Sequence, residues 1–349
     1  MHWDEQRVEN DLRLPGIGDG TVVRTFDAPE AMGVNFHEVR ARSALNRVPG
    51  SRYGFGWTIN PYRGCTHACV FCFARRTHKY LDMDAGRDFE REIVVKVNVP
   101  ELLRAELARP SWKRELVALG TNTDPYQWVE GRYRMMPEIL AALEAADTPV
   151  SVLTKSPLVM RDVEIFERMA ERLPVSVNLS VPTLDEKAWR ATEPHTPSPA
   201  ARLDAVAELR ARGIESGVLI APLMPGINDD PAQVQPIIDR AREAGATFLG
   251  GVALHLRDEV RDVFFAWLQA KRPDLLPQYE KLYKGGRAYL PASERQKLTS
   301  KVRGWGRSRG RRPPPLTSRG RSGRDFEYPS VEEASVPSTN ATPIQDALF

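Results

Sequence analysis

The residues best suited to chemistry are Cys65, Cys69 and Cys72, which are the only cysteines in the 349-residue chain. They lie within eight consecutive positions with the spacing C-x3-C-x2-C, so a single loop brings three thiolates to one centre. A disulfide scaffold would instead show many cysteines, usually an even number, in a short secreted chain. The spacing therefore indicates a metal centre.

Three protein thiolates are one fewer than the four ligands that close a structural zinc site or a standard iron–sulfur cluster. A four-iron cluster in this loop would have one iron without a protein ligand, and an open coordination position is the mark of a centre that does chemistry. The alternative is a zinc site with His67 as the fourth ligand, although zinc ligands usually come as two spaced pairs.

The chain around this loop predicts an α/β fold. Short β-rich runs alternate with amphipathic stretches, which argues for βα units, a parallel sheet and right-handed crossovers that curl into a barrel or part of one. A closed eight-stranded barrel and an open doubly wound sheet remain alternatives. The expected strands are 54–60, 93–99, 115–120, 150–154, 175–181, 216–221 and 247–256. The expected helices are 73–81, 101–109, 136–146, 162–172, 200–212, 231–244 and 258–270.

Polar residues follow several of these strands, where α/β barrels place their functional groups. Residues 120–127 follow one strand, and Lys155 and Ser180 follow the next two. Hydroxyl, amide and ammonium groups suit a ligand rich in hydroxyl and carboxylate groups. Each such residue taken alone is equally well explained as a turn former or a helix cap. Further candidates at strand ends are Thr154, Asn178, Thr183, Asn228 and His255.

The cysteine loop resembles the signature of the radical S-adenosylmethionine (SAM) enzymes. The resemblance implies that the amino and carboxylate groups of SAM chelate the open iron. It also implies that one electron from the cluster breaks the sulfonium to give a 5′-deoxyadenosyl radical. Phe71 stands where that family has an aromatic residue near the adenine. The implied fold is a partial (β/α)6 TIM-type barrel.

Three further fragments resemble the spore photoproduct lyase-related branch of this superfamily, and within it uncharacterised actinobacterial members. They are NPYRGC at 60–65, TDPYQ at 123–127 and LTKS at 153–156, and the likeness runs from about residue 35 to about 290. The resemblance implies SAM contacts by Thr123 and Lys155, with Ser180 as a further cofactor-binding residue. It gives Glu193 and Arg202 a structural or SAM-supporting role.

One departure from that branch is the absence of a fourth cysteine. Spore photoproduct lyase uses such a cysteine, on the segment after the second strand, to return a hydrogen atom to its thymine radical. The corresponding segment here reads GTNTD at 120–124, and a threonine O–H is a far poorer hydrogen-atom donor. Repair by that route is therefore not expected, and a cysteine-ligated auxiliary cluster is excluded. Tyr62 and Tyr126 are either hydrogen-atom donors or packing residues.

Composition sets further bounds. With 42% hydrophobic and 27% charged residues and a net charge of +3, the chain is typical of a soluble globular protein. We expect a cytoplasmic protein, since free thiols suit a reducing compartment and the first residues, MHWDE, do not resemble a secretory signal. Three regions are expected: an irregular extension at 1–50, the core at 51–300 and a disordered tail at 301–349.

The expected tail has two features. Residues 301–324 contain nine Lys or Arg and no acidic residue, a composition that can attract a phosphate backbone. The last five residues, QDALF, resemble the short peptide by which bacterial replication and repair proteins dock on the DNA sliding clamp. Gln345, Leu348 and Phe349 would make that contact.

The sequence therefore predicts a radical SAM enzyme with one [4Fe–4S] cluster, an external one-electron donor of the flavodoxin or ferredoxin type, and an unassigned substrate. Nucleic acid is the leading substrate class. The alternatives are a radical SAM enzyme acting on a peptide or small molecule, and a non-catalytic, metal-stabilised module that binds nucleic acid. Residues that act directly on the substrate are not identified.

Overall fold

The computed structural model describes residues 22–24, 33–48 and 54–302, and a seven-stranded sheet forms its centre. The strands lie in the order β11-β10-β9-β8-β7-β4-β3, and those from β4 to β11 run parallel. β3 (Leu45–Arg47) pairs with β4 antiparallel. The edge strands β3 and β11 do not pair with each other, so the barrel is partial, as predicted. The parallel strands are β4 (Trp57–Ile59), β7 (Val117–Leu119), β8 (Val150–Thr154), β9 (Val175–Ser180), β10 (Gly217–Leu223) and β11 (Phe248–Ala253).

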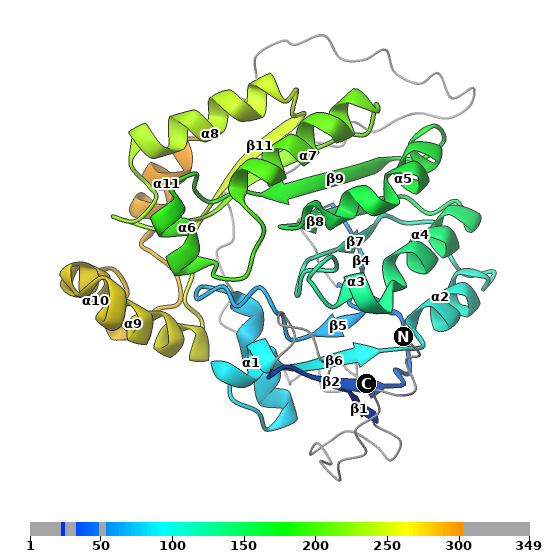
Figure 1. The fold of residues 1–349 in the computed structure, drawn as a ribbon, viewed down its shortest axis with the longest axis horizontal. Coiled ribbons are helices and arrows are strands. Elements are labelled where there is room, and N and C mark those ends of the chain that lie inside the picture. The colour runs from blue at the N-terminus through cyan, green and yellow to red at the C-terminus, as the bar shows by residue number, and fades with distance from the viewer. Residues whose placement is uncertain (1–21, 25–32, 49–53, 303–349) are drawn as a thin grey trace.

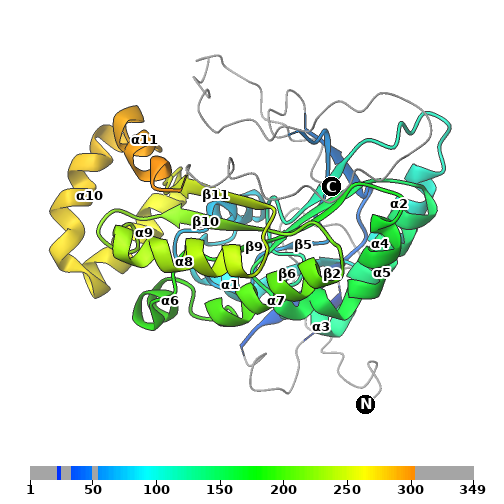
Figure 2. The same cartoon turned by 90° about the horizontal axis from the view of Figure 1, so that it is seen from above.

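Helices cover the outer side of this sheet (Figures 1 and 2). Their starts follow from local sequence: Ser198 accepts a hydrogen bond from Ala201 N at 3.2 Å, and Asp230 accepts one from Ala232 N at 2.8 Å. A proline follows each of these caps, where its missing N–H costs nothing. The covering helices are α2 (Val99–Leu107), α4 (Met135–Ala145), α5 (Val163–Ala170), α7 (Pro199–Ala211) and α8 (Pro231–Glu243).

The core lies between the sheet and these helices. Val150, Val152 and Val177 on the strands are fully buried, as are Leu140 on α4 and Phe166 on α5. Each fully buried aliphatic or aromatic side chain contributes about 1.5–3 kcal/mol relative to exposure. This rigid layer fixes the strand ends from which the polar candidates project.

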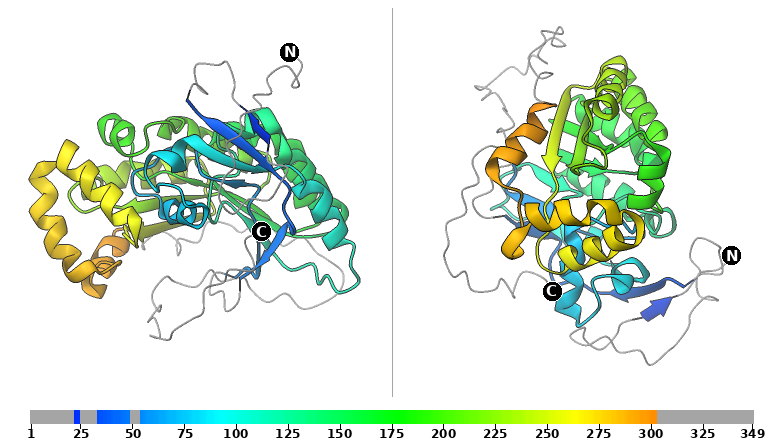
Figure 3. Two further views of the ribbon diagram at one scale, coloured as in Figure 1. Left: turned by 90° about the horizontal axis from the view of Figure 1, so that it is seen from below. Right: turned by 90° about the vertical axis from the view of Figure 1, so that its left-hand side faces the viewer.

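The last helices gather at one end of the molecule, coloured yellow to orange in Figure 3. They are α9 (Glu259–Lys271), α10 (Leu276–Leu282) and α11 (Ala292–Ser300). α11 contacts the edge strand β11, and Val302, which follows it, is buried against Gly251. A side chain added at Gly251 would place its Cβ 2.9 Å from Val302 Cγ2.

A second sheet of four strands, in the order β1-β2-β6-β5, lies beside the barrel (Figure 1). β2 runs parallel to β6, whereas β1 and β5 pair antiparallel to their neighbours. The expectation that residues 1–50 are irregular is wrong at β1, β2 and β3, because β2 pairs with β6, β3 pairs with β4, and β1 pairs with β2. The strands of this sheet are β1 (Val22–Arg24), β2 (Asn35–Val39), β5 (Tyr62–Arg63) and β6 (Glu92–Lys96).

Several short helices complete the described chain. None of the described helices is long and apolar enough to cross a membrane. The expected tail lies outside the described residues from 303 onward. The short helices are η2 (Phe73–Leu81), α1 (Arg87–Arg91), α3 (Glu130–Tyr133), η3 (Pro157–Asp162), α6 (Glu186–Thr192), η4 (Pro273–Leu275) and η5 (Lys284–Gly286).

Candidate active site

The cysteine loop begins directly after β5 and ends at η2, and its own backbone folds it. Cys65 N donates to Phe89 O at 2.9 Å, which ties the start of the loop to α1. Two turns follow, in which Ala68 N donates to Cys65 O at 3.3 Å and Cys72 N to Cys69 O at 3.2 Å. These turns bring the three cysteines into one compact segment.

Gln127 fastens this loop to the segment after β7. Its Oε1 accepts from Thr66 N at 2.9 Å, and its Nε2 donates to Gly64 O at 3.0 Å. The Gln127 side chain is fully buried, so both bonds are shielded from water. Gln127 therefore holds the loop on either side of Cys65.

Arg75 supports the loop from the opposite direction. Its guanidinium is fully buried and donates to Cys69 O at 2.9 Å and to Ala68 O at 3.1 Å. It also donates to Ala85 O at 3.0 Å and forms an ion pair with Glu90. One side chain thus joins the cysteine loop to the chain leading into α1.

The three thiols suit a metal centre. Cys65 and Cys69 are buried and Cys72 is half-buried, and none forms a disulfide. Burial raises the pKa of all three thiols, and Glu193 raises that of Cys69 further. A bound metal lowers the pKa of its thiol ligands, so positive charge at this point would favour the thiolates. The donor set and its burial fit a cluster of several irons.

The single-zinc alternative has no geometric support. Among residues 22–24, 33–48 and 54–302, no three His, Cys, Asp or Glu side chains converge as ligands of one ion. His67 instead turns toward Asp124, with Nδ1 3.4 Å from Oδ2 but without the alignment of a hydrogen bond. A four-iron cluster carries its thiolates on different irons, so the three sulfur atoms need not meet at one point.

Lys155, at the carboxyl end of β8, brings three of the other predicted residues together. Its Nζ donates to Ser180 Oγ at 2.8 Å and lies 2.5 Å from Glu193 Oε1. The same Nζ lies 5.5 Å from the centre of the Phe71 ring. Because Phe71 precedes Cys72 directly, the cysteine loop and the strand ends border one site (Figure 1).

Arg202 on α7 anchors this group. It is fully buried and donates to Glu193 Oε2 at 2.9 Å, to Ser180 O at 2.8 Å and to Thr196 Oγ1 at 2.6 Å. Burial alone would raise the pKa of Glu193, but the charges of Arg202 and Lys155 outweigh it and lower that pKa. Glu193 is therefore a carboxylate shared between two cations.

Thr123 lies apart from that group. Its hydroxyl donates to Tyr62 O at 2.9 Å, in the strand that precedes the cysteine loop. Its neighbour Asp124 accepts from Thr154 Oγ1 at 2.6 Å and from Lys155 N at 2.7 Å. Gly120 allows the segment after β7 to pass this close to the end of β8. It has φ +84°, and a Cβ at this position would lie 1.8 Å from Leu153 O.

Tyr62 and Tyr126, the alternative hydrogen-atom donors, belong to a buried polar network. Tyr126 Oη donates to Asp162 Oδ2 at 3.0 Å, and the Tyr62 hydroxyl donates to Glu130. Both rings are fully buried. Burial, followed by the nearby carboxylates, raises the pKa of both phenols. This arrangement favours the packing interpretation.

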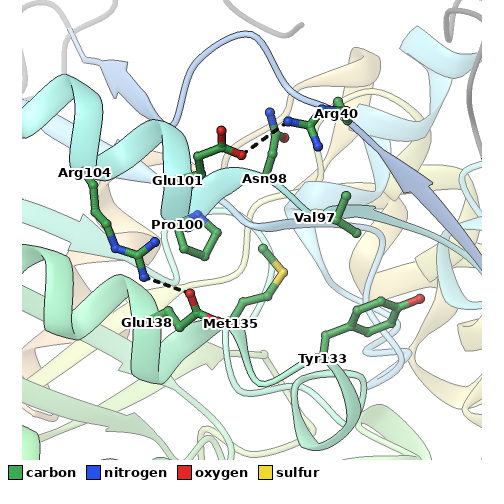
Figure 4. A pocket seen from close by; sticks show the side chains of 9 residues that line it. All are labelled: Arg40, Val97, Asn98, Pro100, Glu101, Arg104, Tyr133, Met135 and Glu138. Carbon is green, nitrogen blue, oxygen red and sulfur yellow. Dashed lines mark hydrogen bonds and ion pairs between the residues drawn. The ribbon is translucent and has the colours of Figure 1, made fainter. Parts of the chain in front are cut away.

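A shallow hollow elsewhere carries none of these groups (Figure 4). It lies where α2 and α4 begin, and two surface ion pairs border it: Arg40–Glu101 at 3.3 Å and Arg104–Glu138 at 2.8 Å. It contains no cysteine and none of the predicted strand-end residues. We therefore place the candidate site at the cysteine loop.

Sequence reasoning overlooked the supports of the loop. Gln127 stood among the strand-end candidates, but nothing in the sequence distinguished it from its neighbours. Arg75 was missed, because four of the groups that it binds are backbone carbonyls, which leave no mark in a sequence. The role of Thr123 in binding SAM stays a prediction.

The fold is similar to solved structures of spore photoproduct lyase. The lyase complexed with dinucleoside spore photoproduct matches with a TM-score of 0.52 and 14% identity, over 78% of this chain and 86% of the lyase. A double mutant with bound AdoMet and the same dinucleoside matches with a TM-score of 0.50 and 14% identity, over 73% of this chain and 81% of the lyase. At this identity the likeness shows the fold alone.

Sequence comparison gives the family. An uncharacterised protein of Mycobacterium tuberculosis is 45% identical over 309 residues, which cover 86% of this chain and 91% of that protein. The model of the radical SAM superfamily matches residues 59–234, which include the cysteine loop and every strand-end candidate except His255. The chain therefore belongs to the radical SAM superfamily, whose members are enzymes that use a [4Fe–4S] cluster and SAM.

Proposed function

We propose that this enzyme uses the radical derived from SAM to abstract hydrogen from a nucleic-acid substrate, in repair or modification. The observation that carries the reaction is the position of Lys155 above Phe71, with Nζ 5.5 Å from the ring centre and Cys72 the next residue. Thiols that suit a cluster and polar groups that suit SAM therefore share one site.

Cys65, Cys69 and Cys72 would hold the cluster, which would supply the one electron needed to cleave the C5′–S bond of SAM. Lys155 offers an ammonium group to the SAM carboxylate, and Glu193 orients that ammonium. Phe71 gives the adenine an apolar face. The electron comes from outside the chain, and we propose a flavodoxin or ferredoxin as its donor.

Nucleic acid as the substrate rests on two observations. The lyase structures of similar fold hold a dinucleoside, and residues 301–324 of this chain carry nine basic and no acidic residues. The missing fourth cysteine argues for a hydrogen-atom route different from that of the lyase. A peptide or small molecule is the alternative substrate, and a non-catalytic binding module is the alternative from another class.

Reconstitution under anaerobic conditions tests the reaction. We expect about four irons per chain, as one cubane cluster requires, and formation of 5′-deoxyadenosine from SAM under dithionite. Replacing Cys65, Cys69 or Cys72 with Ala should abolish that product. Normal cleavage in the Cys69→Ala variant, or stoichiometric zinc without sulfide, would refute the assignment of the loop.

The substrate is tested separately, by comparing modified nucleosides between wild-type and deletion strains. A nucleoside that disappears on deletion, and returns with the wild-type gene but not with the Cys69→Ala variant, supports a nucleic-acid substrate. Identical nucleoside profiles would favour a peptide or small molecule. The cytoplasmic location remains a prediction. The clamp contact of Gln345, Leu348 and Phe349 also remains one, since residues 303–349 lie outside the described structure.

A further inference from the structure

Three aromatic side chains form a row at the rim of the candidate site. Phe73 follows Cys72 directly, His255 follows β11, and Tyr289 precedes α11. The Phe73 and His255 ring centres lie 5.8 Å apart with a 37° tilt. His255 stacks on Tyr289 at 5.6 Å and 25°. Segments distant in sequence thus present one aromatic row.

The backbone fixes this row in place. His255 and Tyr289 form an antiparallel bridge, and Leu256 N donates to Ala288 O at 2.7 Å. η2, which carries Phe73, contacts α9 on the same side of the molecule. The row is therefore part of the folded framework.

The row is open to solvent at both ends. Phe73 is 42% exposed and Tyr289 is 38% exposed, whereas most large apolar side chains of the described structure are buried. Exposed rings held in contact with one another mark a surface that binds something. Burial, followed by the charges of Arg257 and Arg76, lowers the pKa of His255, so the middle ring is neutral at neutral pH.

The charge beside the row is positive. The guanidinium carbons of Arg257 and Arg295 lie 5.8 and 5.9 Å from the centre of the Tyr289 ring. Within the described part of the chain, neither arginine forms an ion pair with a carboxylate. Two acids next to Arg257 in the chain are already paired with other cations, since Asp258 pairs with Arg76 at 3.2 Å and Glu259 pairs with Lys79 at 2.7 Å.

We propose that Phe73, His255 and Tyr289 form a stacking platform for an unpaired base of a nucleic-acid strand, with Arg257 and Arg295 attracting its phosphates. Aromatic rings beside uncompensated cations are the combination that binds single strands, because every base has a face that stacks and every linkage is anionic. This proposal rests on the nucleic-acid part of the proposed function. It adds where the strand is held: beside the third cysteine, so that a neighbouring nucleotide reaches the site.

The test is binding of a fluorescently labelled single-stranded oligonucleotide to the reconstituted full-length enzyme, measured by anisotropy with DNA and RNA probes. We expect Phe73→Ala and Tyr289→Ala each to weaken binding by roughly 5- to 150-fold, the range measured for loss of one base–aromatic stack. Phe73→Leu should lose as much, because its side chain is apolar but has no ring face. Phe73→Trp should retain binding.

Tyr80→Ala is the matched control. Tyr80 lies on the same helix, is 52% exposed, and makes no ring contact with the platform in the described structure. Iron content per chain shows whether each variant is loaded. Equal affinity of wild type, Phe73→Ala and Tyr289→Ala would overturn the platform, as would an equal loss in Tyr80→Ala.

Absence of oligonucleotide binding by the wild-type enzyme would also overturn the platform and would leave a protein or small-molecule occupant. That result leaves the radical reaction untouched, because SAM cleavage is measured in a separate assay that contains no oligonucleotide. The failure of either idea is therefore distinguishable from the failure of the other.

Discussion

Replacing Gln127 with leucine should loosen the cysteine loop without touching a thiol. Gln127 bridges Thr66 N and Gly64 O at 2.9 and 3.0 Å, and leucine is similar in size but has no polar group. The change leaves one donor and one acceptor of the loop backbone without their partner. The variant therefore tests whether the loop is held ready for its metal by the segment after β7.

The magnitude follows from these two groups. A buried donor or acceptor that loses its partner costs about 1–3 kcal/mol. Gly64 is buried, so we assign the loss at its carbonyl a cost in the middle of that range. Thr66 is half-buried, so the loss at its N–H has a cost at the lower end. We therefore expect Gln127→Leu to lower the free energy of unfolding by about 2–4 kcal/mol, a large part of the 5–15 kcal/mol typical of a folded protein.

The assay is urea unfolding of the metal-free protein under anaerobic conditions, together with iron content after reconstitution. Gln235→Leu is the control, because Gln235 also donates one side-chain hydrogen bond, to Asp239 at 2.9 Å, but on the exposed face of α8. That control should change stability by no more than about 0.5 kcal/mol. Equal stability and equal iron content in Gln127→Leu and Gln235→Leu would refute the role of Gln127.

Three further predictions concern the remaining parts of the site and the tail. Lys155→Ala and Thr123→Val should leave about four irons in place but weaken SAM binding, measured by titrating the paramagnetic signal of the reduced cluster. Arg202→Leu should cost about 3–5 kcal/mol of unfolding free energy, because it leaves the Glu193 carboxylate buried with one cation fewer. A Leu348→Ala, Phe349→Ala double variant should lose retention of purified sliding clamp in a pull-down.

Each of these predictions has a result that would count against it. Unchanged SAM affinity in both variants would remove Lys155 and Thr123 from the cofactor site. Arg190→Leu is the control, because it breaks an exposed ion pair, Arg190–Glu186 at 2.9 Å, and should cost at most about 1 kcal/mol of unfolding free energy. An equal cost in Arg202→Leu would contradict the stabilising role of the buried Arg202–Glu193 pair. Clamp retained equally by both proteins, or by neither, would refute the docking peptide.

The Glu193 pair also predicts a pH dependence. The pKa of Glu193 is lowered in the folded protein, so its contribution to stability is complete above the ordinary carboxyl pKa. That contribution disappears as the pH falls through the lowered pKa. The difference in unfolding free energy between wild type and Glu193→Gln should therefore narrow on acidification. If the difference in unfolding free energy between the two proteins stayed constant down to strongly acidic pH, it would contradict our inference that Glu193 is ionised in the folded protein.

The sequence predicted the parallel barrel because period and composition change visibly between strand and helix. The expected strand at 150–154 is observed as β8, and the expected helix at 200–212 differs from α7 by one residue at each end. The second sheet was largely missed, since β1 and β5 are three and two residues long. Its main pairing joins Asn35 to Glu92, and such non-local contacts leave no short-range pattern.

The candidate site shows the same division. Residue types at strand ends made Lys155 and Ser180 candidates, because position along a βα unit fixes which edge of the sheet a residue reaches, whereas Glu193 entered only through the family resemblance. Position does not fix where a hydroxyl points, and Thr123 donates to the backbone of Tyr62. Arg75 could not be predicted for a different reason. Its guanidinium is fully buried and binds backbone carbonyls, and the sequence does not distinguish such an arginine from one exposed to solvent.

The contact of Val302 with Gly251 determines where the tail can be cut. β11 is an edge strand, and an uncovered edge offers unpaired backbone groups to other chains and so invites aggregation. α11 contacts this strand, and Val302 lies against Gly251, where there is no side chain of β11 to shield it. A truncation after Val302 removes every basic residue of the tract except Lys301, together with the terminal peptide, while keeping this cover. A truncation before α11 would expose the strand, and the product would report on aggregation rather than on the tail.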